Sequence, residues 1–160
     1  MTTEIDEILA REAADTMEKL AFIFTYPAED GDDPDGDGVA ARVAFTGAFA
    51  GSMMIRIASS VLPELTANML GLDDGAPVAA EQQHDALKEA LNIICGNVLP
   101  AIAGKTAVFD LAPPVILAAP ADPPAGHLAG RAVLALDEGT LQLWLHIQGE
   151  PAQLLQVMHD

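Results

Sequence analysis

The stretch DALKEALNIICGNVLP, residues 85–100, sets both the fold and the candidate site of this chain. With about 3.6 residues per helical turn, its large apolar residues fall in one narrow stripe, which predicts a core-facing helix. The stripe consists of Leu87, Leu91, Ile94 and Val98. A second line lies on the opposite side and consists of Asp85, Glu89, Asn92 and Gly96. The acid, the amide and the glycine therefore share an outward face, with neighbouring side chains one turn apart.

Two interpretations of this outward face stay open on periodicity alone. Glu and Asn are ordinary residues of a solvent-exposed helix surface. Gly96 favours a contact, because a glycine inside a helix costs roughly 1 kcal/mol relative to alanine, and close approach by another surface would be a reason for it. Cys95 lies between the two stripes, where we expect it to act as a small buried hydrophobe.

Composition and charge limit the class of protein. With 160 residues, 51% of them apolar, we expect a single domain over residues 1–160 with a real core. The formal net charge of −17 disfavours nucleic acids and anionic membrane surfaces as partners, because both bind clusters of Lys and Arg. Apolar runs are broken before the ~20 residues that cross a bilayer. The N-terminal residues are acidic, unlike a secretory signal, and Cys95 is the only cysteine. We therefore expect a soluble cytoplasmic protein without disulfides.

Three helices are predicted from apolar periodicity and capping residues. The predicted segments are residues 3–22, a short segment capped by Ser59 or Ser60 and stopped by Gly71, and a long segment from about residue 78 to Pro100 or Gly104. Thr3 is a suitable N-cap for the first helix, although Asp6 replaces the usual Glu or Gln of a capping box. We expect that helix to end near Tyr26, because the residue before a proline disfavours helical backbone.

Alternating apolar residues predict strands between and after these helices. The predicted strands are a hairpin over residues 39–57, two runs in residues 105–119 that Pro113 and Pro114 interrupt, and a hairpin over residues 127–149 that turns at 137–139. Helices interleaved with hairpins predict an α+β fold, in which an antiparallel sheet packs with two long helices. A long helix followed by a hairpin occurs twice, so the chain reads as two pseudo-duplicated halves.

An acidic segment, AEDGDDPDGDG at residues 28–38, resembles a calcium-binding loop. Asp33, Asp35, Asp37 and Gly38 match positions 1, 3, 5 and 6 of an EF-hand. Position 12, which should be a bidentate Glu, is Ala44, and a strand follows where an EF-hand has a helix. We interpret the segment as a solvated loop, while cation binding by residues 30–37 stays open.

The outward line has no partners for an active site of its own. No Ser–His pair and no metal-ligand spacing accompany it, and the histidines are scattered: His84, His127, His146 and His159. An outward amide can instead enter the active site of another protein and hold a water through one donor and one acceptor. An adjacent carboxylate can pair with a Lys of that protein. The pattern thus indicates catalysis in trans, with an amide that positions the attacking water.

Residues 85–100 closely resemble the signature helix of the CheC/CheX/FliY chemotaxis phosphatases. Asp85, Glu89 and Asn92 match the Asp/Ser, Glu and Asn of that pattern, and Gly96–Asn97 resembles the segment that follows. The family proline corresponds to Pro114, one residue short of the usual spacing, or to Pro113. Residues 45–71 look like the family's glycine-punctuated hairpin and short helix.

The resemblance is greatest to the CheX branch, which has one such site. CheC-like members carry a Glu–x–x–Asn pair in each half, whereas the first helix here has only Glu12 with Asp15 and Glu18 with Ala21. The first half therefore lacks the asparagine.

The resemblance implies a hydrolase of signal transduction that removes phosphate from the phospho-aspartate of a CheY-type response regulator. Asn92 would orient the attacking water and Glu89 would pair with a regulator Lys, while Asp85, Gly96 and Pro114 would shape the contact. The Mg²⁺ would belong to the regulator, so this chain would need no cofactor or metal. A homodimer joined through the sheet edge is also implied. The alternative is a non-catalytic CheX-like module that docks a response regulator or a flagellar component.

Overall fold

Two long hairpins form the middle of the sheet in the computed structural model, which describes residues 3–28, 37–73, 75–118, 124 and 126–149. Their strands are β2 (Gly38–Gly47), β3 (Ala50–Ala58), β6 (His127–Leu136) and β7 (Gly139–Gln148). Both hairpins predicted from the alternating pattern are confirmed, because each strand buries every second residue.

Three short strands complete a sheet of seven antiparallel strands within the described residues. They are β1 (Tyr26–Pro27), β4 (Phe109–Leu111) and β5 (Val115–Leu117). The order is β1-β6-β7-β3-β2-β4, and β5 also pairs with β2. The two hairpins meet in the centre, where Met53 of β3 lies opposite Leu145 of β7. Each half of the chain thus contributes one central and one outer strand, in agreement with the predicted duplication.

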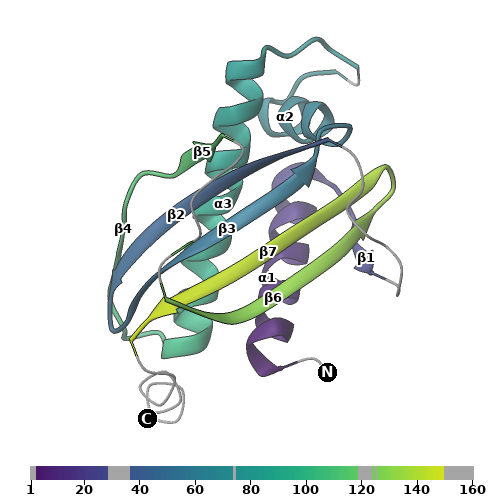
Figure 1. Cartoon of the computed structure of the whole chain (residues 1–160). Coiled ribbons are helices and arrows are strands. Elements are labelled where there is room, and N and C mark those ends of the chain that lie inside the picture. Colours follow the sequence, from purple (N-terminus) through teal and green to yellow (C-terminus); the bar gives the residue numbers. More distant parts are fainter. Residues whose placement is uncertain (1–2, 29–36, 74, 119–123, 125, 150–160) are drawn as a thin grey trace.

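The helices cover one face of this sheet (Figure 1). They are α1 (Glu4–Ala21), α2 (Leu62–Leu70) and α3 (Ala80–Ala103). The predicted core stripe of α3 is confirmed, because Leu87, Leu91, Ile94 and Val98 are all fully buried. These residues join a core cluster with the buried side chains of α1, α2 and the sheet. The predicted α+β fold is therefore confirmed, with the helices forming one layer and the antiparallel sheet the other.

The predicted cap of α1 is confirmed. The Asp6 backbone N–H donates to Thr3 Oγ1 at 3.1 Å, and the Thr3 N–H donates to Asp6 Oδ2 at 3.0 Å. Asp6 thereby completes a capping box although it is not Glu or Gln. Its other oxygen, Oδ1, accepts from the backbone N–H of Arg131 at 2.7 Å, so the start of α1 is tied to β6.

The predicted helix over residues 3–22 is confirmed by α1, Glu4–Ala21, but the expected end near Tyr26 is wrong. Phe22 adopts a left-handed conformation with φ 56°. Its N–H donates to Glu18 O, and the Ile23 N–H donates to Met17 O, as in a Schellman-type end. Such an end normally uses glycine, so a phenylalanine at this position is no signal for it.

The predicted serine cap of α2 is also wrong. Ser60 Oγ donates to the carbonyl of Glu138 in the β6–β7 turn at 2.8 Å, and the residue at the N-cap is Val61, without a side-chain cap. The serine is used in a tertiary contact that local sequence cannot reveal. The predicted stop is confirmed, since Gly71 ends the helix with φ 71°.

The long helix ends as predicted at its second candidate, with Gly104 as the C-cap and Pro100 inside. By length and composition alone α3 could cross a membrane, with a mean hydropathy of 1.2 over an 18-residue window. Half of that window is buried inside the protein, however, which is the condition of a core helix. Most of the acidic segment that resembles a calcium-binding loop, residues 29–36, lies outside the described residues.

Candidate functional site

The outward line of α3 lies where its spacing predicts. Asp85, Glu89, Asn92 and Gly96 are all exposed, on the side of α3 that faces away from the sheet. The buried stripe on the opposite side fixes the helix against the core, so these residues are presented from a rigid element. We call this exposed line, which consists of Asp85, Glu89, Asn92 and Gly96, the ridge.

Within the part of the chain that the structure describes, Glu89 and Asn92 differ from Asp85 in having no side-chain ion pair or hydrogen bond. Asp85 Oδ1 forms an ion pair with Lys88 Nζ at 3.3 Å. Among the described residues, the Glu89 carboxylate has no ion pair and the Asn92 amide has no side-chain hydrogen bond. Glu89 and Asn92 can therefore bind an incoming surface without breaking an existing interaction, whereas Asp85 is already paired.

Gly96 leaves space at the end of the ridge that lies toward the C-terminus of α3. A Cβ placed on Gly96 would meet no atom of the chain within 4 Å. Its backbone also lies outside the left-handed region, so neither packing nor conformation requires a glycine there. A contact from outside the chain remains a physical reason for glycine at this position.

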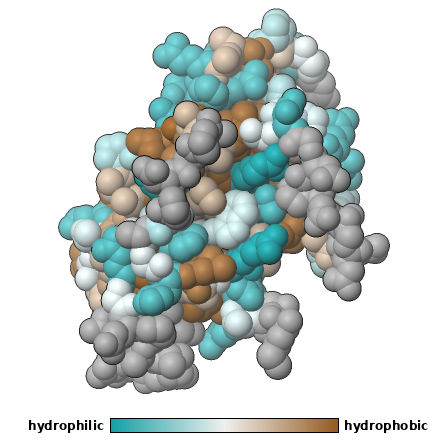
Figure 2. All heavy atoms as spheres, viewed as in Figure 1, coloured by the Kyte–Doolittle hydropathy of each residue, from teal (hydrophilic) through white to brown (hydrophobic). Residues whose placement is uncertain are grey.

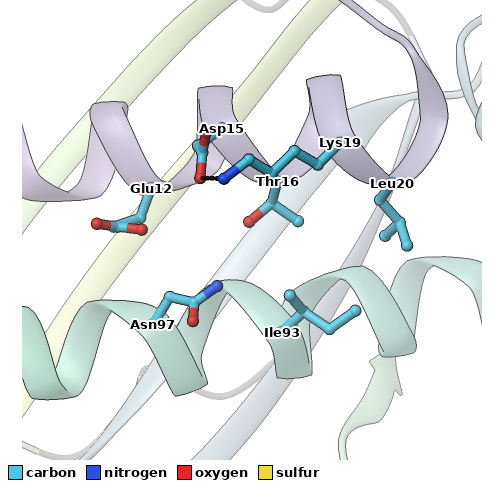
Figure 3. Close-up of a pocket in the computed structure, with 7 residues that line it drawn as sticks. All are labelled: Glu12, Asp15, Thr16, Lys19, Leu20, Ile93 and Asn97. Carbon is cyan, nitrogen blue, oxygen red and sulfur yellow. Dashed lines mark hydrogen bonds and ion pairs between the residues drawn. The ribbon is translucent and has the colours of Figure 1, made fainter.

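A groove runs beside the ridge, between α1 and α3 (Figure 3). It has a volume of about 320 Å³ and is lined by Glu12, Asp15, Thr16, Lys19, Leu20, Ile93 and Asn97. Ile93 and Asn97 each follow a ridge residue by one position, so the groove adjoins the ridge. Sequence reasoning missed the groove because it depends on how α1 packs against α3, which no local pattern encodes.

The acids of α1 differ from Glu89 in their electrostatics. Asp15 Oδ2 is 3.0 Å from Lys19 Nζ, and this pairing raises the pKa of Lys19. Glu12 Oε1 lies 3.5 Å from Arg11 Nε. Both carboxylates of the Glu–x–x–Asp pair are thus engaged by basic neighbours. Glu89 and Asn92 on α3 have no such neighbour among the described residues.

The prolines lie in the connection between β4 and β5, a segment that packs beside α3. Pro114 is half-buried and directly precedes Val115, the first residue of β5, whereas Pro113 is exposed. This position lets either proline shape the segment next to the helix. The choice between them stays a prediction.

The cysteine and the histidines do not join the ridge. Cys95 is fully buried, and this burial raises the pKa of its thiol to about 12, so the thiolate nucleophile is suppressed. His84 is half-buried near the start of α3, His127 is exposed at the start of β6, and His146 is on β7. His159 lies outside the described residues. Among the described residues, no group of three His, Cys, Asp or Glu side chains is placed to hold a metal ion.

The ridge therefore offers one amide and one carboxylate to an external surface. An amide can donate to one oxygen and accept from a water, so it can hold that water in a fixed direction. The carboxylate can form a charge-assisted hydrogen bond with an ammonium group. Among the described residues neither group is paired with a base, so the ridge offers recognition and water positioning rather than an activated nucleophile.

Comparisons with known proteins identify the family of this chain. The model of the family described as chemotaxis phosphatase CheX matches residues 39–121. That range contains the ridge, the short helix α2 and the proline segment, and it spans more than half of the chain. The chain belongs to the CheX family. A search of curated protein sequences finds no match.

Solved structures share the fold at low sequence identity. A CheX chemotaxis protein from Desulfovibrio desulfuricans is 18% identical, with a TM-score of 0.70, over 91% of this chain and 100% of the other. A CheC-like superfamily protein from Shewanella sp. PV-4 is 16% identical, with a TM-score of 0.68, over 93% and 100%. The CheX–CheY–BeF₃–Mg²⁺ complex from Borrelia burgdorferi contains a chain 18% identical, with a TM-score of 0.65, over 89% and 97%.

Proposed function

We propose that this chain is a phosphatase that hydrolyses the phospho-aspartate of a CheY-type response regulator in a chemotaxis pathway of the cytoplasm. The observation that carries the proposal is the Glu89–Asn92 pair on the exposed face of α3 in a CheX-family fold, without a side-chain partner among the described residues. Asn92 enters the regulator's site and orients the attacking water. Glu89 pairs with a regulator Lys and fixes the position of the helix.

The chemistry is divided between two proteins. The regulator supplies the acyl phosphate and the Mg²⁺, and this chain supplies the amide, so it needs no cofactor of its own. The Borrelia complex, which joins a CheX with a CheY, BeF₃ and Mg²⁺, supports a partner of this kind. Asp85, held by Lys88, borders the contact, and Gly96 gives the regulator room to approach α3.

The test is the dephosphorylation rate of a phosphorylated CheY-type regulator from the same genome. The wild type should accelerate hydrolysis, and Asn92→Ala should lose on the order of 10²-fold, because the positioned amide acts only on the transition state. Asn97→Ala is the matched control, since it removes the same amide from the same helix at a side chain that points into the groove (Figure 3). This control should keep the wild-type rate.

Two outcomes contradict the proposal in different ways. If the wild type binds the regulator but leaves its phosphate lifetime unchanged, the chain is a docking module. If Asn92→Ala and Asn97→Ala reduce the rate equally, the ridge is not the site of water positioning.

We also propose that the protein is a homodimer. The short strand β1 pairs only with Ala135 and Leu134, so within the described residues the outer edge of β6 from His127 to Val133 has no neighbouring strand. An unpaired edge is a template for pairing with a second copy. Sedimentation velocity should give twice the mass of the chain, and a monomer would contradict this.

A further inference from the structure

The sheet face opposite the helices carries a row of side chains that the family function does not use. Register places five residues side by side across five strands: Val115 of β5, Arg42 of β2, Met54 of β3, Trp144 of β7 and Arg131 of β6. We call this line the arginine row. The Cα atoms of Arg42 and Arg131 are three strands apart, which corresponds to roughly 14 Å. Figure 1 is viewed from this side, with α1 and α3 behind the strands.

The charge of this face is opposite to that of the whole chain. The net charge is −17, yet three of the four arginines, Arg42, Arg56 and Arg131, lie here. The one acid that register places on this face within the described residues is Asp110, which lies opposite Thr46 at the β4 edge. Among the described residues, register therefore places three arginines and a single acid on this face.

Arg42 and Arg131 have no ion pair within the described residues. No carboxylate of the described residues forms an ion pair with Arg42 or Arg131, although the chain has 24 acids. Arg56 has interactions of its own, so the inference rests on the other two. Arg131 is exposed and Arg42 is half-buried.

The other side chains of the face are apolar or aromatic. Trp144 is the only tryptophan of the chain and lies partly exposed at the centre of the row, beside Met54. Around them, Val115 is 49% exposed, Leu128 is 55% exposed and Tyr26, at the β1 edge, is 50% exposed. Figure 2 shows hydrophobic and hydrophilic side chains interspersed over this face. Trp, Met and Arg are the residue types most enriched in the cores of protein interfaces.

We propose that the arginine row is a docking surface for an acidic segment of a partner protein other than the response regulator. Carboxylates of the segment pair with Arg42 and Arg131, and an apolar side chain between them packs on Trp144 and Met54. Because the ridge of α3 lies on the opposite layer, the protein can hold this partner and a regulator at the same time. The surface thus places the phosphatase next to an acidic protein.

Charge selects this partner over two others. A second copy packed face to face would bring arginines against arginines. The net charge of −17 repels any anionic partner at long range, but the repulsion is far stronger for a nucleic acid, which is charged at every phosphate, than for a short acidic segment. An acidic protein segment needs only the local field and the aromatic anchor.

The test uses a fluorescently labelled peptide of repeated Glu-Glu-Leu units as the probe, with a Lys-Lys-Leu peptide for comparison. Only the acidic peptide should raise its anisotropy to saturation and shift the emission of Trp144, the sole tryptophan. The double variant Arg42→Gln/Arg131→Gln should bind about tenfold more weakly, as expected for two lost ion pairs at a surface. Arg11→Gln, which removes the same charge from the helix layer, is the matched control and should bind normally.

Several results would overturn the proposal. The first is failure of the acidic peptide to bind, and the second is equal binding of the Lys-Lys-Leu peptide. Equal weakening by Arg11→Gln would show a general charge effect. Co-sedimentation with phosphatidylserine vesicles, without peptide binding, would assign the face to an anionic lipid surface. The double variant should still dephosphorylate the regulator like the wild type, so this test is independent of the proposed activity.

Discussion

Glu89 and Asp85 are both exposed acids on the same helix face, but only Asp85 has a partner within the chain. An exposed ion pair contributes little stability, yet it occupies the carboxylate and neutralises its local charge. Glu89 has no such ion pair among the described residues, so its carboxylate is available to an incoming ammonium group. At the scale of single residues, the state of pairing therefore separates the candidate for partner binding from a residue that only borders the site.

Replacement of Gly96 should separate stability from function. Gly96→Ala should raise the free energy of unfolding by roughly 1 kcal/mol, because alanine favours the helix and its Cβ meets no atom of the chain. The same variant should weaken phosphatase action, because the Cβ occupies the space into which the regulator docks. Urea unfolding and the dephosphorylation assay measure the two effects. A stabilised variant with full activity would remove Gly96 from the contact.

At the scale of elements, Asp6 links the first helix to the last hairpin. Burial favours a higher pKa for Asp6, but hydrogen bonds from the Thr3 and Arg131 backbone and from the Thr3 side chain outweigh it, so the pKa lies below 3.8. Asp6→Ala should cost about 1–2 kcal/mol at neutral pH, since it removes a cap and a tertiary bond.

The pH dependence of this loss follows from the direction of the shift. A carboxyl whose folded pKa is depressed stabilises the fold above its unfolded pKa, and the contribution disappears as pH falls through the folded value. The difference in unfolding free energy between wild type and Asp6→Ala should therefore shrink as pH falls below 3.8. Asp6→Asn, which keeps an acceptor oxygen, should lose less stability. A difference that does not change with pH would show that the charge of Asp6 is irrelevant.

The elements that could be predicted from sequence are those whose signals are local. The period of residues 85–100 fixed the buried stripe of α3 and the outward line, and strand alternation fixed both hairpins. The two helix ends that were predicted wrongly, the start of α2 and the end of α1, have no local sequence signal. Ser60 binds Glu138, far away in sequence, and Phe22 takes a conformation that normally requires glycine.

The candidate site shows the same division. The positions of Glu89 and Asn92 on one exposed line follow from helical geometry, so sequence was sufficient. The Asp15–Lys19 ion pair is an i,i+4 pair within α1 and so is also local. That Glu12 faces Asn97 across a groove depends instead on the pairing of α1 with α3. The arginine row could not be predicted from sequence, because its five members come from five strands and only strand register aligns them.

At the scale of the whole molecule, self-repulsion of the acids opposes folding. The charge is −17, and the ion pairs Arg11–Glu12, Asp15–Lys19 and Asp85–Lys88 are at least partly exposed, so they offset little of this repulsion. The unfolding temperature should rise when NaCl is increased from about 0.01 M to about 0.15 M, because the Debye length falls from ~30 Å to ~8 Å. Thermal unfolding followed by circular dichroism measures this. A fall with added salt would mean that attractive pairs dominate.

The position of β7 also has a consequence for synthesis of the protein on the ribosome. This strand, Gly139–Gln148, lies between β3 and β6 in the middle of the sheet, although it is the last strand of the described chain. Until the second hairpin has emerged, β3 has a free edge and the apolar faces of α1 and α3 have no complete sheet to cover. The nascent polypeptide must therefore keep these surfaces from other chains until translation has passed Gln148, and only then can the two halves join.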